Sequence, residues 1–305
     1  MVNLLNRWDR TAGIDDISTV EETDNSYAHL ERCDPATDMV MVESEDGRLA
    51  GYTRVTWWQV EDGERVYATF ANVDPDWMDR GVFESLIDAA IARATDIAAS
   101  HDVDCPKLLE GWAETRCEPT KTAAYRTRGY APITYEATMV RPNLDEIGLH
   151  PLEDGLEIRP VDETHLRAIF DADSEAFRDH WGYVAPSQEE FEKFCGFPYR
   201  DESLWKVAWD GDAIAGQVRS FINPAENEAF GRRRGWTEFI STGRAWRRKG
   251  VARALIAASL RELRARGMTE AALGVHTENP NGAFALYESM GYVQDQLWAT
   301  LRRPV

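Results

Sequence analysis

The sequence predicts a mixed α/β protein made of two tandem copies of one unit. Strand-like and helix-like segments alternate throughout the chain, and helices between strands are typical of α/β architectures. The segment "TAAYRTRGYAP" (122–132) matches "FALYESMGYVQ" (284–294), because each has a Tyr, three residues and then Gly-Tyr. A glycine at a predicted helix start precedes each match, Gly81 in the first half and Gly250 in the second. These observations together indicate an internal repeat.

Length and charge narrow the class of protein. The chain has 305 residues and a net charge of −19, so two domains are expected and the surface repels nucleic acid and anionic lipid. No apolar stretch approaches the roughly 20 residues of a membrane span, and the start lacks a signal peptide pattern. The four cysteines have no metal-binding spacing. We therefore expect a cytoplasmic protein with free thiols, no metal, no nucleic-acid partner and no membrane partner, and leave its oligomeric state open.

The second half has the clearer order of elements. A linker is expected at 146–155, between a domain at 1–145 and one at 156–305. After it we expect a strand and an amphipathic helix, a hairpin over 203–222, a strand over 235–243 and a helix over 250–267. A buried strand over 270–276, a short helix over 282–292 and a final alternating strand complete this copy.

The first half repeats this order weakly. We expect a hairpin over 38–58 that turns at Asp46-Gly47, then a strand, a loop and a helix over 65–100. The pattern provides no opening strand and helix like those of the second half. The first copy is therefore predicted to be incomplete.

The segment "RRKGVARAL" (247–255) predicts an anion-binding site. The start of a helix leaves backbone N–H groups unpaired, and its dipole adds partial positive charge. Gly250 and Ala252 keep the backbone accessible, and Arg247, Arg248 and Lys249 add full charges. A solvated basic helix start is the alternative interpretation.

This segment resembles the pyrophosphate-binding R/Q-x-x-G-x-G/A signature of the GNAT acyltransferase superfamily. The segment "ENPNGAFALYESMGY" (278–292) resembles the last helix motif of that superfamily, and the two motifs occur in the expected order. The resemblance covers about residues 156–301. The duplicated arrangement with a decayed first copy is similar to mycothiol synthase and related tandem GNAT proteins.

The resemblance implies two tandem GNAT-like domains, each a mostly antiparallel mixed sheet flanked by helices. It also implies acetyl-CoA as the donor substrate, with pantetheine along the strand before the basic loop and pyrophosphate on the loop amides. The implied donor-binding residues are Ile240, Ser241, Thr242, Arg247, Arg248, Lys249, Gly250, Val251, Ala252, Arg253, Asn279 and Tyr287.

The first copy is expected to have lost its donor site. When Gly81 is aligned with Gly250, Met78 takes the place of Arg247 and Phe83 that of Ala252. We expect the ring of Phe83 to block a phosphate, and Asp76 and Asp79 to repel it.

Acetyl transfer to an amine needs a base for the amine and a proton for the leaving thiolate. We predict Tyr287 as the proton donor, although a half-buried packing residue is the alternative. Glu238 is the first candidate for the base, because it lies two residues before Ile240 and should share its strand face. His276 is a further candidate.

A loop after the first helix of the second copy, "FRDHWGY" (177–183), lines the acceptor pocket in this superfamily. Its candidate substrate-binding residues are Asp179, His180 and Trp181, with a packing role as the alternative.

The predicted function is acetyl-CoA-dependent N-acetylation of a small-molecule amine by direct attack. Two alternatives remain open at this point. One is an acyl-CoA-binding sensor or interaction protein without turnover, and the other is acetylation of a protein N-terminus or lysine.

Overall fold

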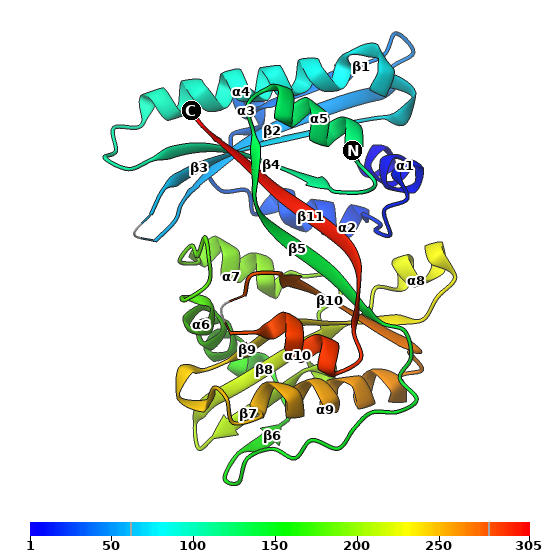
Figure 1. Cartoon of the computed structure of the whole chain (residues 1–305), viewed down its shortest axis with the longest axis vertical. Coiled ribbons are helices and arrows are strands. Elements are labelled where there is room, and N and C mark those ends of the chain that lie inside the picture. Colours follow the sequence, from blue (N-terminus) through cyan, green and yellow to red (C-terminus); the bar gives the residue numbers. More distant parts are fainter. Residues whose placement is uncertain (62, 280) are drawn as a thin grey trace. The chain divides into compact units, whose positions relative to one another are not determined.

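The computed structural model describes residues 1–61, 63–279 and 281–305, and these form two compact units. The first unit comprises Met1–Glu136 with Leu297–Val305, and the second comprises Ala137–Gln296. Both are mixed α/β units, as predicted (Figure 1). Among the described residues, no helix is both long and apolar enough to cross a membrane. The four cysteines are free thiols, as expected.

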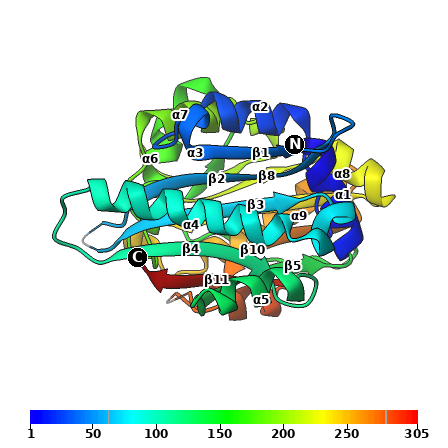
Figure 2. The ribbon, with the colours of Figure 1, turned by 90° about the horizontal axis from the view of Figure 1, so that it is seen from above.

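The first unit is a sheet of strand order β1-β2-β3-β4-β11, in which only β3 and β4 pair in parallel. Helix α4 runs along this sheet, as Figure 2 shows, and buries Leu86, Ile87 and Ala90 against it. The elements in chain order are α1 (Val2–Ala12), α2 (Val20–Ala28), α3 (Pro35–Asp38), β1 (Met39–Glu43), β2 (Leu49–Gln59), β3 (Arg65–Val73), η1 (Pro75–Arg80), α4 (Val82–Ser100), β4 (Lys107–Glu114), α5 (Pro119–Thr127) and β5 (Ala131–Arg141).

The second unit has the sheet order β10-β9-β8-β7-β6, again with a single parallel pair, β9 and β10. Helix α9 packs on one face of β7, β8 and β9. The elements are β6 (Glu157–Arg159), η2 (Glu163–His165), α6 (Leu166–Phe177), α7 (Gln188–Cys195), η3 (Glu202–Leu204), β7 (Lys206–Asp210), β8 (Ala213–Phe221), α8 (Pro224–Phe230), β9 (Arg234–Thr242), η4 (Arg244–Trp246), α9 (Val251–Ala265), β10 (Glu270–His276), α10 (Ala283–Ser289) and β11 (Val293–Pro304).

Equivalent glycines show that the two units share one design. A Cβ on Gly51 would lie 2.7 Å from Leu86 and 3.0 Å from the Asn72 carbonyl oxygen. A Cβ on Gly216 would lie 3.3 Å from Leu255 and 2.9 Å from the Ser241 carbonyl oxygen. In both units the main helix and the neighbouring strand therefore pack so tightly around this position of the hairpin's second strand that a Cβ would force a neighbour to move. This confirms the predicted internal repeat.

The start of the first unit differs in part from the prediction. No strand precedes β1 in residues 1–38, all of which are described, so the expected loss of the opening strand is correct. The expected loss of the helix is wrong, because α1 and α2 are present. Thr19 and Glu22 form a capping box that starts α2, and Leu4 anchors α1 in the core.

The divide between the units falls elsewhere than at the predicted linker. Residues 146–155 contain neither helix nor strand, but the units separate inside β5, after Glu136. The end of β11 belongs to the first unit, where it pairs antiparallel with β4 from Trp298↔Glu114 to Pro304↔Leu108. Figure 1 traces this strand in red. Alternating apolar and polar residues predict a strand but not the strand that it pairs with. From the sequence alone, this strand was therefore assigned to the second copy.

A buried ion pair fixes this strand in the first unit. The guanidinium of Arg302 is 7% exposed and binds Glu110, which is 3% exposed, and also Glu64. A buried carboxylate that loses its only close cation is strongly destabilising.

We predict that Arg302→Met lowers the free energy of unfolding by about 3–5 kcal/mol. The measurement is urea denaturation followed by circular dichroism. Arg303→Met is the control on the same strand, since Arg303 bonds the Arg128 carbonyl oxygen and lies 5.7 Å from the centre of the Tyr130 ring, and the loss of these two contacts should cost about 1–2 kcal/mol. Equal costs for the two variants would mean that the strand is not held by Arg302.

Candidate active site

The site of the second unit is organised where β9 and β10 separate. The two strands pair from Arg234↔Glu270 to Trp236↔Ala272, and beyond that point both continue but no longer pair with each other. The backbone N–H of Gly274 then donates to Glu238 Oε1 at 2.7 Å. A carboxylate thus bridges the gap, and separated strands leave backbone groups for an extended ligand.

A β-bulge in β9 decides which way Glu238 faces. Gln217 pairs with Ser241, but Arg219 pairs with Glu238, so β9 has one extra residue here. Phe239 takes up the bend with a φ of 50°, a left-handed conformation that a bulky residue seldom adopts. Glu238 therefore shares a face with Ser241. The predicted shared face with Ile240 is wrong, because one extra residue reverses the alternation.

A buried ion pair supports the bulge from α6. Arg219 is 4% exposed, and its Nη2 lies 2.7 Å from Asp173 Oδ2. The guanidinium also lies 4.1 Å from the centre of the Phe239 ring. Burial raises the pKa of Asp173, and the positive charge of Arg219 opposes that effect. This pair was not predicted from the sequence, although an Arg within the apolar strand "AGQVRSF" was a signal for it.

Tyr287 lies in α10, and its hydroxyl has no hydrogen-bond partner among the described residues. The residue is 5% exposed, and within the described residues its hydroxyl makes no hydrogen bond. Burial, followed by the negative charge of Glu238, raises the pKa of Tyr287 above its ordinary value. The hydroxyl therefore stays protonated at neutral pH and lies within the field of Glu238.

The hydroxyl of Tyr125, the equivalent residue of the first unit, already makes a hydrogen bond. Its hydroxyl donates to the Thr69 carbonyl oxygen at 2.7 Å. Gly111 permits this approach, because a Cβ there would lie 2.4 Å from the Tyr125 ring. The repeat places Leu273 at the position of Gly111, so the second unit has no such opening.

The surrounding hydrogen bonds show that these tyrosines are true equivalents. Thr69 Oγ1 lies 3.1 Å from the Tyr130 hydroxyl, and Thr237 Oγ1 lies 2.7 Å from the Tyr292 hydroxyl. The two threonines also donate to the next strand, Thr69 to the Glu110 carbonyl and Thr237 to the Ala272 carbonyl. The predicted packing role of Tyr125 agrees with its buried contacts.

The loop before α9 has the features of an anion site. Gly250 caps α9 with a φ of 82°, and Arg248 has a φ of 63°. The N–H groups of residues 248–253 make no backbone hydrogen bond within the described chain, and a Cβ on Gly250 would meet nothing within 4 Å. Val251 is buried, so only its backbone can contribute. Successive backbone N–H groups in such a turn form a concave anion-binding surface.

Thr242, at the end of β9, adds a second observation. Its Oγ1 is buried and has no partner among the described residues. An orphaned hydroxyl between the separated strands and the basic loop suits a polar ligand along that path. These features fit an extended molecule that carries phosphate at one end.

The side chain of Arg247 does not face this loop. Its three nitrogens bind the Thr242 carbonyl at 3.2 Å, Asp179 at 2.8 Å and the Ala176 carbonyl at 2.8 Å. Arg244 adds a two-point contact with Asp179, at 3.0 and 2.7 Å. The side chain of Arg247 therefore secures the end of α6. Only its backbone is placed to serve the predicted pyrophosphate site.

Asp179 is consequently engaged by arginines, which changes its expected role. Hydrogen bonds from Arg244, then Arg247, hold the pKa of Asp179 well below its usual range. We name these three residues the arginine clasp. A carboxylate with both oxygens in ion pairs is poorly placed to receive an amine, so its predicted substrate-binding role loses support.

His180 and Trp181, the other two predicted substrate-binding residues, directly follow Asp179 in the chain. His180 packs on Phe177 with ring centres 4.4 Å apart, and burial lowers its pKa. Trp181 is 47% exposed, with its ring 5.5 Å from that of His276. Asn279 Oδ1 accepts the Asn281 N–H at 2.8 Å in the turn before α10. Pro280 lies outside the described residues.

The corresponding loop of the first unit has the opposite charge. Arg7 of α1 lies 3.3 Å from Asp74 and 2.8 Å from Asp76. Phe83 is 1% exposed and belongs to the core, so the expectation that its ring obstructs the loop is wrong. Acidic residues, rather than a bulky ring, distinguish this loop from that of the second unit.

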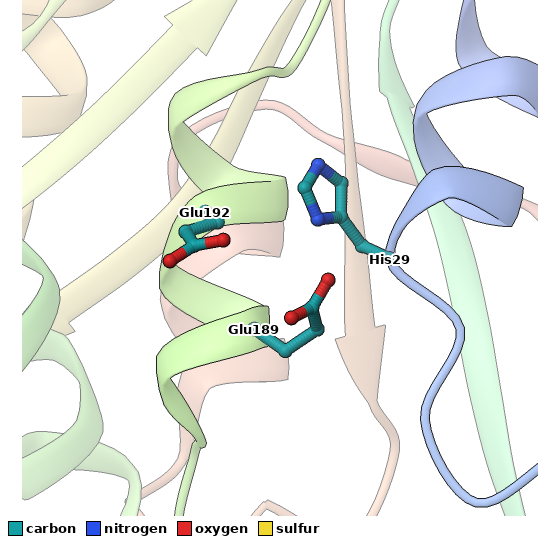
Figure 3. A group of neighbouring side chains, drawn as sticks. All are labelled: His29, Glu189 and Glu192. Carbon is teal, nitrogen blue, oxygen red and sulfur yellow. The ribbon is translucent and has the colours of Figure 1, made fainter.

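Helix α7 carries a pair of acidic residues. Glu189 and Glu192 lie on successive turns of that helix (Figure 3). His29, also labelled in Figure 3, belongs to the first unit. Two carboxylates on one exposed helix are common without a metal, so they define no site. The expected absence of a metal stays a prediction.

The comparisons with known proteins agree with this geometry. Residues 166–292 match the model of the acetyltransferase (GNAT) family. A GCN5-related N-acetyltransferase from Sphaerobacter thermophilus is 21% identical with a TM-score of 0.69, covering 99% of this chain and 91% of its own. A tandem GNAT protein from the clavulanic acid biosynthesis pathway is 15% identical with a TM-score of 0.64, covering 99% and 95%. No curated protein matches the sequence.

Residues 166–292, less than half of the chain, thus match the acetyltransferase (GNAT) family, and this match supports an acyltransferase. The fold of both units, with mostly antiparallel mixed sheets flanked by helices, is that of GNAT proteins. The similarity to mycothiol synthase stays a prediction.

We predict that Asp179→Asn tightens acetyl-CoA binding by roughly two- to fivefold at low salt, because it removes a negative charge that is paired with Arg247 of the basic loop. The gain should shrink at high salt. Calorimetry at two ionic strengths measures it, with Asp171→Asn on the same helix as control. Unchanged donor affinity together with a raised KM for the acceptor would restore Asp179 as a substrate-binding residue.

Proposed function

We propose that the second unit transfers an acetyl group from acetyl-CoA to the amine of a small molecule by direct attack. The observation that carries this proposal is the uncommitted hydroxyl of Tyr287 within the field of Glu238, where β9 and β10 separate. The family match supports acyl transfer in general, and the geometry supports the finer assignment.

Acetyl-CoA is proposed as the donor because residues of this unit suit both its pyrophosphate and its pantetheine. The unpaired N–H groups of residues 248–253 would hold the pyrophosphate, assisted by Arg248, Lys249 and Arg253. Thr242 and the edge of β9 that no longer pairs with β10 would bind the pantetheine amides, beside Ile240 and Ser241. Acetyl-CoA supplies the thioester carbon that the amine attacks.

Glu238 and Tyr287 divide the proton transfers between them. Glu238 accepts a proton from the amine, and its bond from the Gly274 N–H holds the carboxylate in place. The Tyr287 hydroxyl donates a proton to the sulfur as the carbon–sulfur bond breaks. The raised pKa of Tyr287 keeps it in the acid form throughout an ordinary assay range.

The first unit is proposed not to bind the donor. Its loop is acidic and held by Arg7, and the hydroxyl of Tyr125 is already bonded to Thr69. Neither the phosphate site nor the proton donor of the second unit has a counterpart here.

We expect Gly250→Val to abolish acetyl-CoA binding and Gly81→Val to leave it intact. Both glycines cap a helix with positive φ, 82° and 72°, so the backbone strain is matched. Only Gly250 lies on the proposed phosphate path. Calorimetry should give one site per chain for the wild type. Two equivalent sites, or loss of binding in Gly81→Val, would contradict the assignment.

A second matched pair tests the chemistry. Tyr287→Phe should lower kcat by about 10²–10⁴-fold with little change in stability. Tyr125→Phe should leave kcat unchanged but cost about 1 kcal/mol of stability through the lost bond to Thr69. Thiol release and urea denaturation measure the two effects. Unaltered turnover in Tyr287→Phe would reduce Tyr287 to a packing residue.

A further inference from the structure

The face of the second sheet that bears Glu238 also bears a row of aromatic rings. Trp236 precedes Glu238 by two residues, and Phe221 pairs with Trp236 as Arg219 pairs with Glu238. Because side chains alternate along a strand, these four residues lie on one face. The proposed base therefore borders an aromatic surface.

The rings are nearly parallel and extend away from Glu238. Phe221 and Trp236 have ring centres 6.1 Å apart and planes inclined by 7°. Tyr199 continues the row at 6.4 Å from Phe221, inclined by 15°. Phe197 meets Phe221 edge-on at 5.2 Å and supports the row from the side. None of these four rings is fully buried, so each retains surface for a ligand.

Helix α8 fixes the orientation of Trp236. The indole Nε1 donates to Glu226 Oε2 at 2.7 Å, and Glu226, which is 4% exposed, also binds Arg232. This helix occupies the connection 222–233 between β8 and β9, whereas the first unit connects β2 and β3 by the short segment 60–64. The unit with the proposed donor site thus also has an added helix that holds an aromatic ring in place.

The charged side chains next to the aromatic rings determine which polar group of a ligand this face can bind. Arg219 is committed to Asp173 and covered by Phe239, so it offers no cation to a substrate. Glu226, which is 4% exposed, already binds Trp236 and Arg232, so the carboxylate of β9 that borders the rings is that of Glu238. A ligand that suits the surface is flat and apolar at one end and carries a basic nitrogen at the other.

We propose that the acceptor is an arylalkylamine, whose aromatic ring packs on Phe221 and Trp236 while its nitrogen reaches Glu238. This inference rests on the proposed function and names its substrate class. A bond forms between the amine nitrogen and the acetyl carbon, and the carbon–sulfur bond breaks. The amine proton passes to Glu238, and the thiolate takes the proton of Tyr287.

The test compares kcat/KM for 2-phenylethylamine and tryptamine with that for ethylamine, spermidine, glucosamine and a peptide with a free N-terminus. We expect the two aryl amines to exceed all the others by at least about tenfold, the amount that one buried apolar group contributes. Trp236→Leu should remove most of that preference and Trp236→Phe should keep it. Trp58→Phe in the first unit should change nothing.

Each outcome decides between the two proposals. Faster turnover of spermidine, glucosamine or the peptide would overturn the arylalkylamine assignment and leave the acetyltransferase function standing. An equal loss for every amine in Trp236→Leu would also overturn it, since the ring would then serve the fold. If no amine is acetylated while acetyl-CoA binds, the proposed function fails together with the assignment.

Discussion

The separation of β9 and β10 is the constraint on which the second unit depends. Parallel strands that part inside a sheet leave backbone groups unpaired, which is costly unless something takes their place. Glu238 does so at Gly274, and the bulge at Phe239 turns Glu238 to the position where it can. The pair of Arg219 with Asp173 then supports the bulge. The unfavourable backbone conformation of Phe239 is therefore stabilised by contacts with β8 and α6, through the buried ion pair.

The two units show which parts of this fold can change independently. The close packing at Gly51 and Gly216 and the hydrogen bonds of Thr69 and Thr237 are kept in both. The loop before the main helix is not kept, since one loop is acidic and bound by an arginine while the other is basic and bound by an aspartate. Packing defines the fold, and a few side chains at one helix start determine whether an anion is attracted.

The sequence predicted the elements that depend on local patterns. The hairpins, α9 with its capping glycine and the short helix of Tyr287 all follow from periodicity and turn residues. The bulge was not predictable, because Phe239 adopts a conformation that usually signals glycine. The partners of Asp179 were not predictable either, since Arg244 and Arg247 lie in and just after η4, far along the chain from the end of α6 where Asp179 lies. A sequence motif locates a loop, but only the tertiary structure shows which side chains of that loop already bind other residues.

The strand β11 has a consequence for how the chain is made. On the ribosome, every other strand of the first unit emerges before the second unit is begun, yet β4 must wait for Leu297–Val305. Until then the nascent chain presents the open edge of β4, with unpaired N–H and C=O groups that can recruit a foreign strand. The first unit therefore completes its sheet only after the second unit has been synthesised. Separate expression of the two halves would leave that edge permanently bare.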